Sequence, residues 1–136
     1  MQFSTIFTNI NFTFDTMDLR KLQKIAVAAL EDIKAKDIEV LNTTKLTALF
    51  DRIIIATGDS NRQVKALARS VHDKVKEAGG EVIGMEGEET SEWILVDLGD
   101  IVVHIMQPSI RTYYNLEELW QKAPKRPAPK AVAKDE

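Results

Sequence analysis

The sequence predicts an α/β domain in which about five strands form a mixed sheet, with helices packed mainly on one face. Two segments carry apolar residues at three-and-four spacing, which is typical of amphipathic helices. Short apolar runs lie between and after them in the order strand, helix, strand, which predicts a crossover connection. Two β-rich runs around residue 100 predict an antiparallel hairpin. We expect this domain to span residues 17–122.

The first helix is expected over residues 19–33, where leucine, isoleucine and alanine line one face and Asp18 can cap the start. A short strand over residues 38–41 and a turn at residues 42–44 follow it. The next run, 53–55, is continuously apolar. That pattern predicts a strand that is buried on both faces and therefore central in the sheet.

The second helix is expected to begin at Ser60, which can form a capping box with Gln63, and to end at Gly79-Gly80. One strand precedes this helix and another run follows it. We therefore expect residues 82–85 to form a strand parallel to the strand that contains Ile53. A last helix is expected over about residues 113–120.

The hairpin is the most informative part of the sequence. If Leu98 and Gly99 are its two turn residues, counting outward assigns each strand residue to one of two faces. One face is wholly aliphatic and should pack under the helices. The other, which we call the outer face, pairs Trp93 with His104, Leu95 with Val102 and Asp97 with Asp100, and extends to Met106.

The outer face is more apolar than a solvated sheet face normally is. An exposed apolar patch with a polar rim marks a binding surface, and a tryptophan often anchors such a surface. The alternative is that the last helix or residues 1–16 cover this face. Because His104 has no partner at a useful spacing, we expect it to be a packed or hydrogen-bonded residue rather than a catalytic base.

The two ends of the chain differ from this domain in composition. Residues 1–16 hold four of the five phenylalanines and no Lys or Arg, so they fit neither a signal peptide nor a mitochondrial presequence. We expect a poorly ordered N-terminal extension, with an extra edge strand as the alternative, and a native domain that begins near Met17. Residues 123–136 are rich in Pro, Ala and Lys, which predicts a disordered tail.

The composition argues against several functional classes. The net charge is -3, from 18 basic and 21 acidic residues, whereas proteins that bind RNA phosphates usually carry a basic excess. We therefore expect no specific nucleic-acid partner. The chain has no cysteine, which excludes disulfides, thiol catalysis and zinc–thiolate sites and fits the cytoplasm. No apolar run approaches the roughly 20 residues that span a bilayer, and nothing predicts a cofactor.

An enzymatic alternative rests on acidic residues. Asp97 and Asp100 could hold Mg²⁺ beside a phosphate bound at the Gly58-Asp59-Ser60 turn, as in a metal-dependent nucleotidyltransferase-like enzyme. However, aspartate is common beside tight turns, and the Asp-x-Asp spacing of that class is missing. We therefore expect no enzyme activity. The acidic loop over residues 86–89 is either solvated or a contact for a basic protein.

Three segments in register resemble one protein family. Residues 56–64 (ATGDSNRQV), 93–106 (WILVDLGDIVVHIM) and 111–120 (RTYYNLEELW) look like the ribosomal silencing factor family, also called the Iojap family. The resemblance extends from Met17 to about Trp120. It implies a nucleotidyltransferase-like fold that lacks the catalytic residues of that superfamily, and a possible homodimer when the protein is free.

The resemblance also implies a translational repressor. Such a protein binds ribosomal protein L14 (uL14) on the large subunit and sterically blocks joining of the small subunit, in stationary phase or nutrient limitation. We expect Arg111, Tyr113 and Trp120 to pack the last helix against the sheet, with Tyr113 or Tyr114 in the contact as an alternative. The expected partner-binding residues are those of the outer face, namely Trp93, Leu95, Asp97, Asp100, Val102, His104 and Met106.

Overall fold

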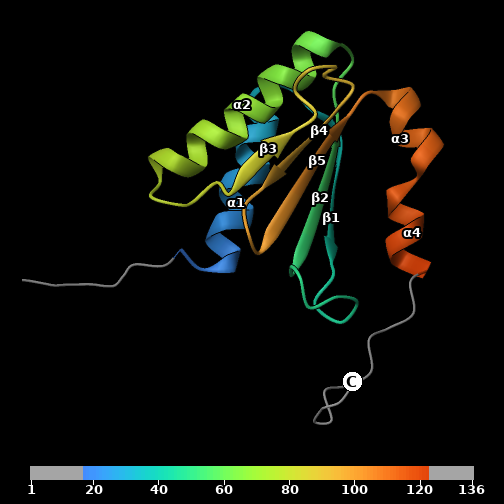
Figure 1. Ribbon diagram of the computed structural model, residues 1–136. Coiled ribbons are helices and arrows are strands. Elements are labelled where there is room, and N and C mark those ends of the chain that lie inside the picture. Colours follow the sequence, from blue (N-terminus) through green and yellow to red (C-terminus); the bar gives the residue numbers. More distant parts are fainter. Residues whose placement is uncertain (1–16, 123–136) are drawn as a thin grey trace, which may run out of the picture.

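The computed structural model describes residues 17–122 as three layers, with a sheet between two pairs of helices (Figure 1). Helices α1 and α2 cover one face of the sheet, and the shorter α3 and α4 lie over the other. The elements are α1 (Leu19–Asp32), β1 (Lys36–Asn42), β2 (Arg52–Thr57), α2 (Asn61–Glu77), β3 (Gly84–Glu86), β4 (Trp93–Asp97), β5 (Ile101–Met106), α3 (Pro108–Tyr114) and α4 (Leu116–Lys122).

The mixed five-stranded sheet that we predicted is confirmed, with the order β1-β2-β5-β4-β3. Strand β2 lies in the interior of the sheet, between β1 and β5, and is buried along most of its length, as the apolar run predicted. The strand parallel to β2 is β5, however, and β3 pairs antiparallel with β4 at the edge. The predicted parallel strand over residues 82–85 is therefore wrong. The central place goes to β5 because all six of its residues are buried, whereas β3 has only three residues, none of them buried.

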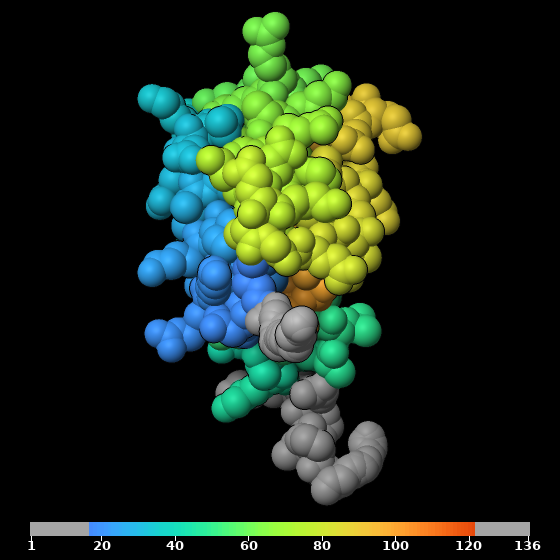
Figure 2. All heavy atoms as spheres, turned by 90° about the vertical axis from the view of Figure 1, so that its left-hand side faces the viewer, coloured from blue at the N-terminus to red at the C-terminus, as the bar shows by residue number. Residues whose placement is uncertain are grey.

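The inner face of the sheet packs against α1 and α2, which lie side by side in Figure 2. Asp18 caps α1 by accepting a hydrogen bond from the backbone N–H of Lys21, and Ser60 caps α2 by accepting one from that of Gln63. The amide of Gln63 also donates to the carbonyl oxygens of Ile33 and Lys34, which ties the start of α2 to the end of α1. Both predicted helix starts are confirmed.

The hairpin differs from its predicted register by two residues. Leu98 donates its backbone N–H to the carbonyl of Ile101 at 2.9 Å, so that Gly99 and Asp100 are the two turn residues. Gly99 has a φ of 90°, which a glycine adopts readily at the first central position of such a turn. Trp93 consequently lies opposite Met106, and Leu95 opposite His104. Because the shift is even, every side chain keeps its predicted face.

The last helix is interrupted where a single helix was predicted over residues 113–120. Asn115 ends α3 with a φ of 47°, a left-handed conformation that asparagine tolerates. Its side chain accepts from the backbone N–H of Glu118 at 3.4 Å, near the start of α4. We call residues 108–122 the arm.

Two predictions concern segments outside the described residues, namely the extension over residues 1–16 and the tail over residues 123–136. Within residues 17–122, no helix is both long and apolar enough to cross a membrane.

Candidate docking groove on the outer face of the sheet

The outer face of β4 and β5 is partly covered by the arm. Met106 is fully buried, and Val102 and His104 are nearly so, whereas Trp93, Leu95 and Asp97 are half-buried. Asp100 is exposed in the turn. The alternative that the last helix covers this face therefore holds at the Met106 end. The seven residues that we predicted lie on one side of the molecule, but they do not form a fully open surface.

Trp93 joins the sheet to the arm. Its indole N–H donates to Nδ1 of His104 at 2.9 Å, and its ring lies 4.9 Å from that of Tyr114, between ring centroids. Tyr114 in turn contacts Tyr113 edge-on. The only hydrogen-bond donor of the Trp93 side chain is therefore used within the protein. Trp93, Tyr113 and Tyr114 form an aromatic cluster, and the two tyrosines keep part of it exposed.

His104 is held neutral at physiological pH. Burial lowers the pKa of its imidazole from 6.5 to about 4, because the charged form would lose its hydration. Accepting the indole N–H at Nδ1 also requires that nitrogen to be unprotonated. These observations fit the expectation that His104 is a packed, hydrogen-bonded residue.

Arg111 holds the arm against strands β1 and β2 of the sheet. Its guanidinium donates to Glu117 of α4 through Nε at 2.9 Å and through Nη2 at 2.6 Å. Nη1 donates to the hydroxyl of Thr57 in β2 and to the carbonyl oxygen of Asp37 in β1. The prediction that Arg111 packs the last helix onto the sheet is correct. That for Tyr113 is wrong, because its side chain faces solvent and is 81% exposed.

A groove of about 870 Å³, which we call the docking groove, lies between the outer face and α4. Leu95, Val102 and His104 line it from the hairpin, with Ile53 of β2 beside them. Three large apolar side chains at its border are strongly exposed, Leu49 at 82%, Ile83 at 62% and Leu119 at 60%. Carboxylates line it as well, those of Glu86, Asp97 and Asp100.

Sequence reasoning missed the border residues of this groove. Leu49 lies in a loop, Ile83 lies just before β3 in a segment that we predicted as a strand, and Leu119 lies in a helix that we expected to pack. Single apolar residues in loops carry no periodic signal. Only their gathering on one side reveals a surface of the kind that binds other proteins.

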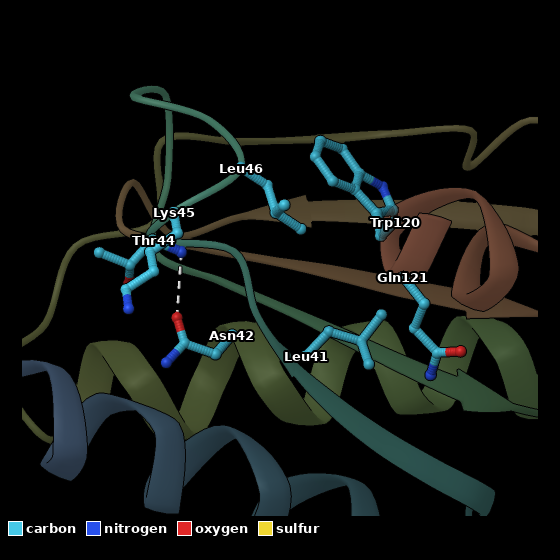
Figure 3. Close-up of a pocket in the computed structure, with 7 residues that line it drawn as sticks. All are labelled: Leu41, Asn42, Thr44, Lys45, Leu46, Trp120 and Gln121. Carbon is cyan, nitrogen blue, oxygen red and sulfur yellow. Dashed lines mark hydrogen bonds between the residues drawn. The ribbon is translucent and has the colours of Figure 1, made fainter. Parts of the chain in front are cut away.

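A second hollow, of about 510 Å³, lies on the other side of Trp120 (Figure 3). Leu41 and Leu46 line it together with Trp120 and Gln121, and the side chain of Asn42 accepts from the backbone N–H of Thr44 beside it. Trp120 lines both hollows, and its ring meets that of Phe50 edge-on at 5.5 Å, between ring centroids. The end of α4 therefore stands between two open spaces.

Some of the acidic residues near the groove have a structural role. Oδ1 of Asp97 accepts the backbone N–H of Gly99 at 2.9 Å, which stabilises the turn. Gly87, in the acidic loop, has a φ of 94°, and a side chain there would collide with the carbonyl oxygen of Trp93. Among residues 17–122, no three His, Cys, Asp or Glu side chains lie close enough together to hold a metal ion.

Comparisons with known proteins give a consistent result. A family model described as "Ribosomal silencing factor during starvation" matches residues 16–136. A "Ribosomal silencing factor RsfS" from Chromobacterium violaceum is 61% identical over 104 residues, 76% of this chain and 85% of that protein. One from Bacillus subtilis is 44% identical over 108 residues, 79% of this chain and 92% of that protein. A crystal structure of a Chromobacterium violaceum protein superposes with a TM-score of 0.76 at 57% identity, covering 83% of this chain and 94% of that one.

Proposed function

This chain belongs to the ribosomal silencing factor family, and from that premise we propose that it represses translation by binding the large ribosomal subunit through uL14. A protein of 15.3 kDa seated on uL14 occupies space that the small subunit needs for joining. It acts in the cytoplasm, in stationary phase or nutrient limitation. No step of this function requires catalysis, a metal or a cofactor.

The observation that carries this proposal is the docking groove. A soluble monomer rarely gathers large exposed apolar side chains on one side, and doing so marks a protein-binding surface. Leu49, Ile83 and Leu119 border the groove, and Tyr113 and Tyr114 are exposed on α3. These are five of the six large hydrophobic residues that are exposed in the part of the chain described by the structure.

The charge of the groove favours a basic partner. Glu86, Asp97 and Asp100 line it, and within residues 17–122 none of these three carboxylates forms an ion pair with a Lys, Arg or His side chain. Ribosomal proteins are generally basic, so carboxylates at the rim would attract such a partner and suppress acidic ones. The fitting partner surface therefore presents apolar side chains flanked by Lys or Arg.

The direct test is sedimentation of the purified protein with separated ribosomal subunits. We expect the protein to travel with large subunits and not with small ones. Large subunits saturated with the protein should then form fewer joined ribosomes when small subunits are added. Protein that travels only with small subunits, or large subunits that join normally at saturation, would refute the proposal.

Trp93→Ala tests the predicted contact at the Met106 end of the outer face, since Trp93 itself does not line the docking groove. Truncating an aromatic anchor of an interface costs about 2 kcal/mol or more, which is a loss of about thirtyfold in affinity for large subunits. The variant loses the stacking on Tyr114 and the indole hydrogen bond to His104 but leaves the inner core intact, so the main thermal transition should shift less than in a variant of the inner core. Affinity equal to that of the wild type would place the contact elsewhere.

The free protein offers the same apolar surface to a second copy. We propose that it can dimerise through this face when ribosomes are absent. Light scattering with and without large subunits tests the idea, because a dimer that persists on the subunit cannot share the face.

A further inference from the structure

The docking groove exists only while the arm is in place. Leu116, Leu119 and Trp120 of α4 line one side of it, and the sheet lines the other. No residue from 108 to 121 is buried, so the arm has no core of its own that fixes its position. What holds it is a small number of side-chain contacts.

The two aromatic contacts of the arm are partly exposed. Tyr114, which stacks on Trp93, is 50% exposed, and Trp120 meets Phe50 between the two hollows. Aromatic pairs add only a modest stabilisation beyond the area that they bury. These aromatic pairs can orient the arm, but only the polar contacts of Arg111 are shielded from solvent.

Arg111 joins three elements to α3. It contacts Glu117 of α4, Thr57 of β2 and Asp37 of β1. The Asp37 carbonyl is available because β1 has a register shift between Lys36 and Glu39, which leaves that residue out of the ladder with β2. Four hydrogen bonds use most of the five N–H donors of a guanidinium.

Arg111 is also shielded from any partner. Its side chain is 11% exposed and that of Glu117 is 24% exposed, and their 2.6 Å ion pair has no net charge. Its donors already point inward to the protein's own oxygens. Arg111 therefore cannot be a contact residue of the groove.

We propose that Arg111 is a positioning residue, which holds the arm so that the groove is formed before the partner arrives. This inference rests on the proposed function for the identity of the site. The apparent affinity of a site scales with the fraction of molecules in which it is formed. If loss of Arg111 lowers that fraction to about one tenth, affinity for large subunits falls about tenfold.

The chain contains its own probe of the arm. Its two tryptophans are Trp93, under Tyr114, and Trp120, on the arm itself. Displacement of the arm exposes both indoles, so quenching of tryptophan fluorescence by acrylamide reports arm position independently of ribosome binding.

The experiment compares Arg111→Ala with Arg69→Ala, an arginine that is exposed on α2. Each variant removes one positive charge. Losing a cation near the groove should, by charge alone, strengthen attraction to a basic partner, so weaker binding by Arg111→Ala can come only from the arm. We expect Arg111→Ala to show greater acrylamide quenching and about tenfold weaker binding, with Arg69→Ala like the wild type on both. Arg111→Lys, which keeps the charge but loses the planar fork, should lie between them.

The readouts separate this inference from the proposed function. Greater quenching with unchanged ribosome binding, or unchanged quenching in Arg111→Ala, overturns the positioning role while uL14 binding stands. If the wild-type protein does not bind large subunits, the proposed function is refuted. Acrylamide quenching of tryptophan fluorescence then still shows whether Arg111 holds the arm. Should Arg111→Ala not fold, Glu117→Gln removes only the charged partner and is measured in the same way.

Discussion

The two sides of the sheet are built differently. On the inner side, α1 and α2 bury a continuous stripe of Leu, Val and Ala against apolar strand residues, and much of the core lies there. On the outer side, the arm contributes no buried residue from 108 to 121 and is held by aromatic contacts and by Arg111. The inner side determines whether the chain folds, whereas the outer side determines what the folded chain presents.

This division separates stability from binding. A packed core tolerates little change in volume, while a groove needs exposed apolar atoms and an orderly border. Substitutions on the inner side should therefore act mainly on the free energy of unfolding. Substitutions around the groove should act mainly on affinity for the large subunit, and the buried hairpin residues between them should affect both.

Leu67→Ala should give the largest effect on stability. The side chain is fully buried in α2, and deleting such a leucine leaves a cavity that costs about 2–5 kcal/mol. Urea unfolding should show this loss in the midpoint, and folded variant protein should still bind large subunits. A cost below about 1 kcal/mol would mean that the inner core is much looser than its burial indicates.

Acid should destabilise the protein through His104. Its folded pKa is about 4 and the ordinary value is 6.5, so between these pH values the unfolded chain binds more protons. Stability is therefore complete above about pH 6.5 and falls by up to about 3 kcal/mol as the pH drops to about 4.

Urea unfolding at several pH values checks this dependence. His104→Asn supplies an amide oxygen as an acceptor for the Trp93 indole but no titrating imidazole, so its stability should change less over this range. His72→Asn, in α2, is the matched control and should keep the full dependence. Equal acid sensitivity in the wild type and His104→Asn would show that other groups are responsible.

Leu119→Ser should give the smallest effect on stability and a clear effect on binding. The side chain is 60% exposed at the border of the groove, and exposed substitutions usually change stability by less than about 0.5 kcal/mol. Affinity for large subunits should fall roughly three- to tenfold, about 1 kcal/mol. Val40→Ser, on β1 away from this groove, is the control and should bind normally. Equal affinity in both variants would show that Leu119 of α4 does not belong to the docking surface.

Several features could be predicted from the sequence because local interactions specify them. The caps at Asp18 and Ser60 depend on a side chain and a backbone N–H three residues away. The interior position of β2 in the sheet follows from its unbroken apolar run. The face of each hairpin residue was correct despite the wrong turn, because alternation along a strand survives a shift of two residues.

The docking groove could be predicted only in part. Leu95, Asp97, Asp100, Val102 and His104 lie in it as residues of the hairpin. Gly99 of the turn lies there as well. Its other residues come from β2 and the loop before it, from β3 and the segment before it, and from the arm, which are far apart in the sequence. Trp93, which we predicted as an open contact, turns out to support the arm through Tyr114 as well.

The sequence by itself determined most of the helices and strands, which side of each is apolar, and which family the motifs resemble, since these depend on neighbours within a few positions. Tertiary structure alone decided that β5 and not β3 lies beside β2, that the arm covers part of the outer face, and that Arg111 reaches Asp37. Such pairings join residues that are distant in the sequence: the β2–β5 partners are 49 positions apart, and Asp37 and Arg111 are 74 apart. They result from many weak contacts summed over the whole fold, which no local pattern records.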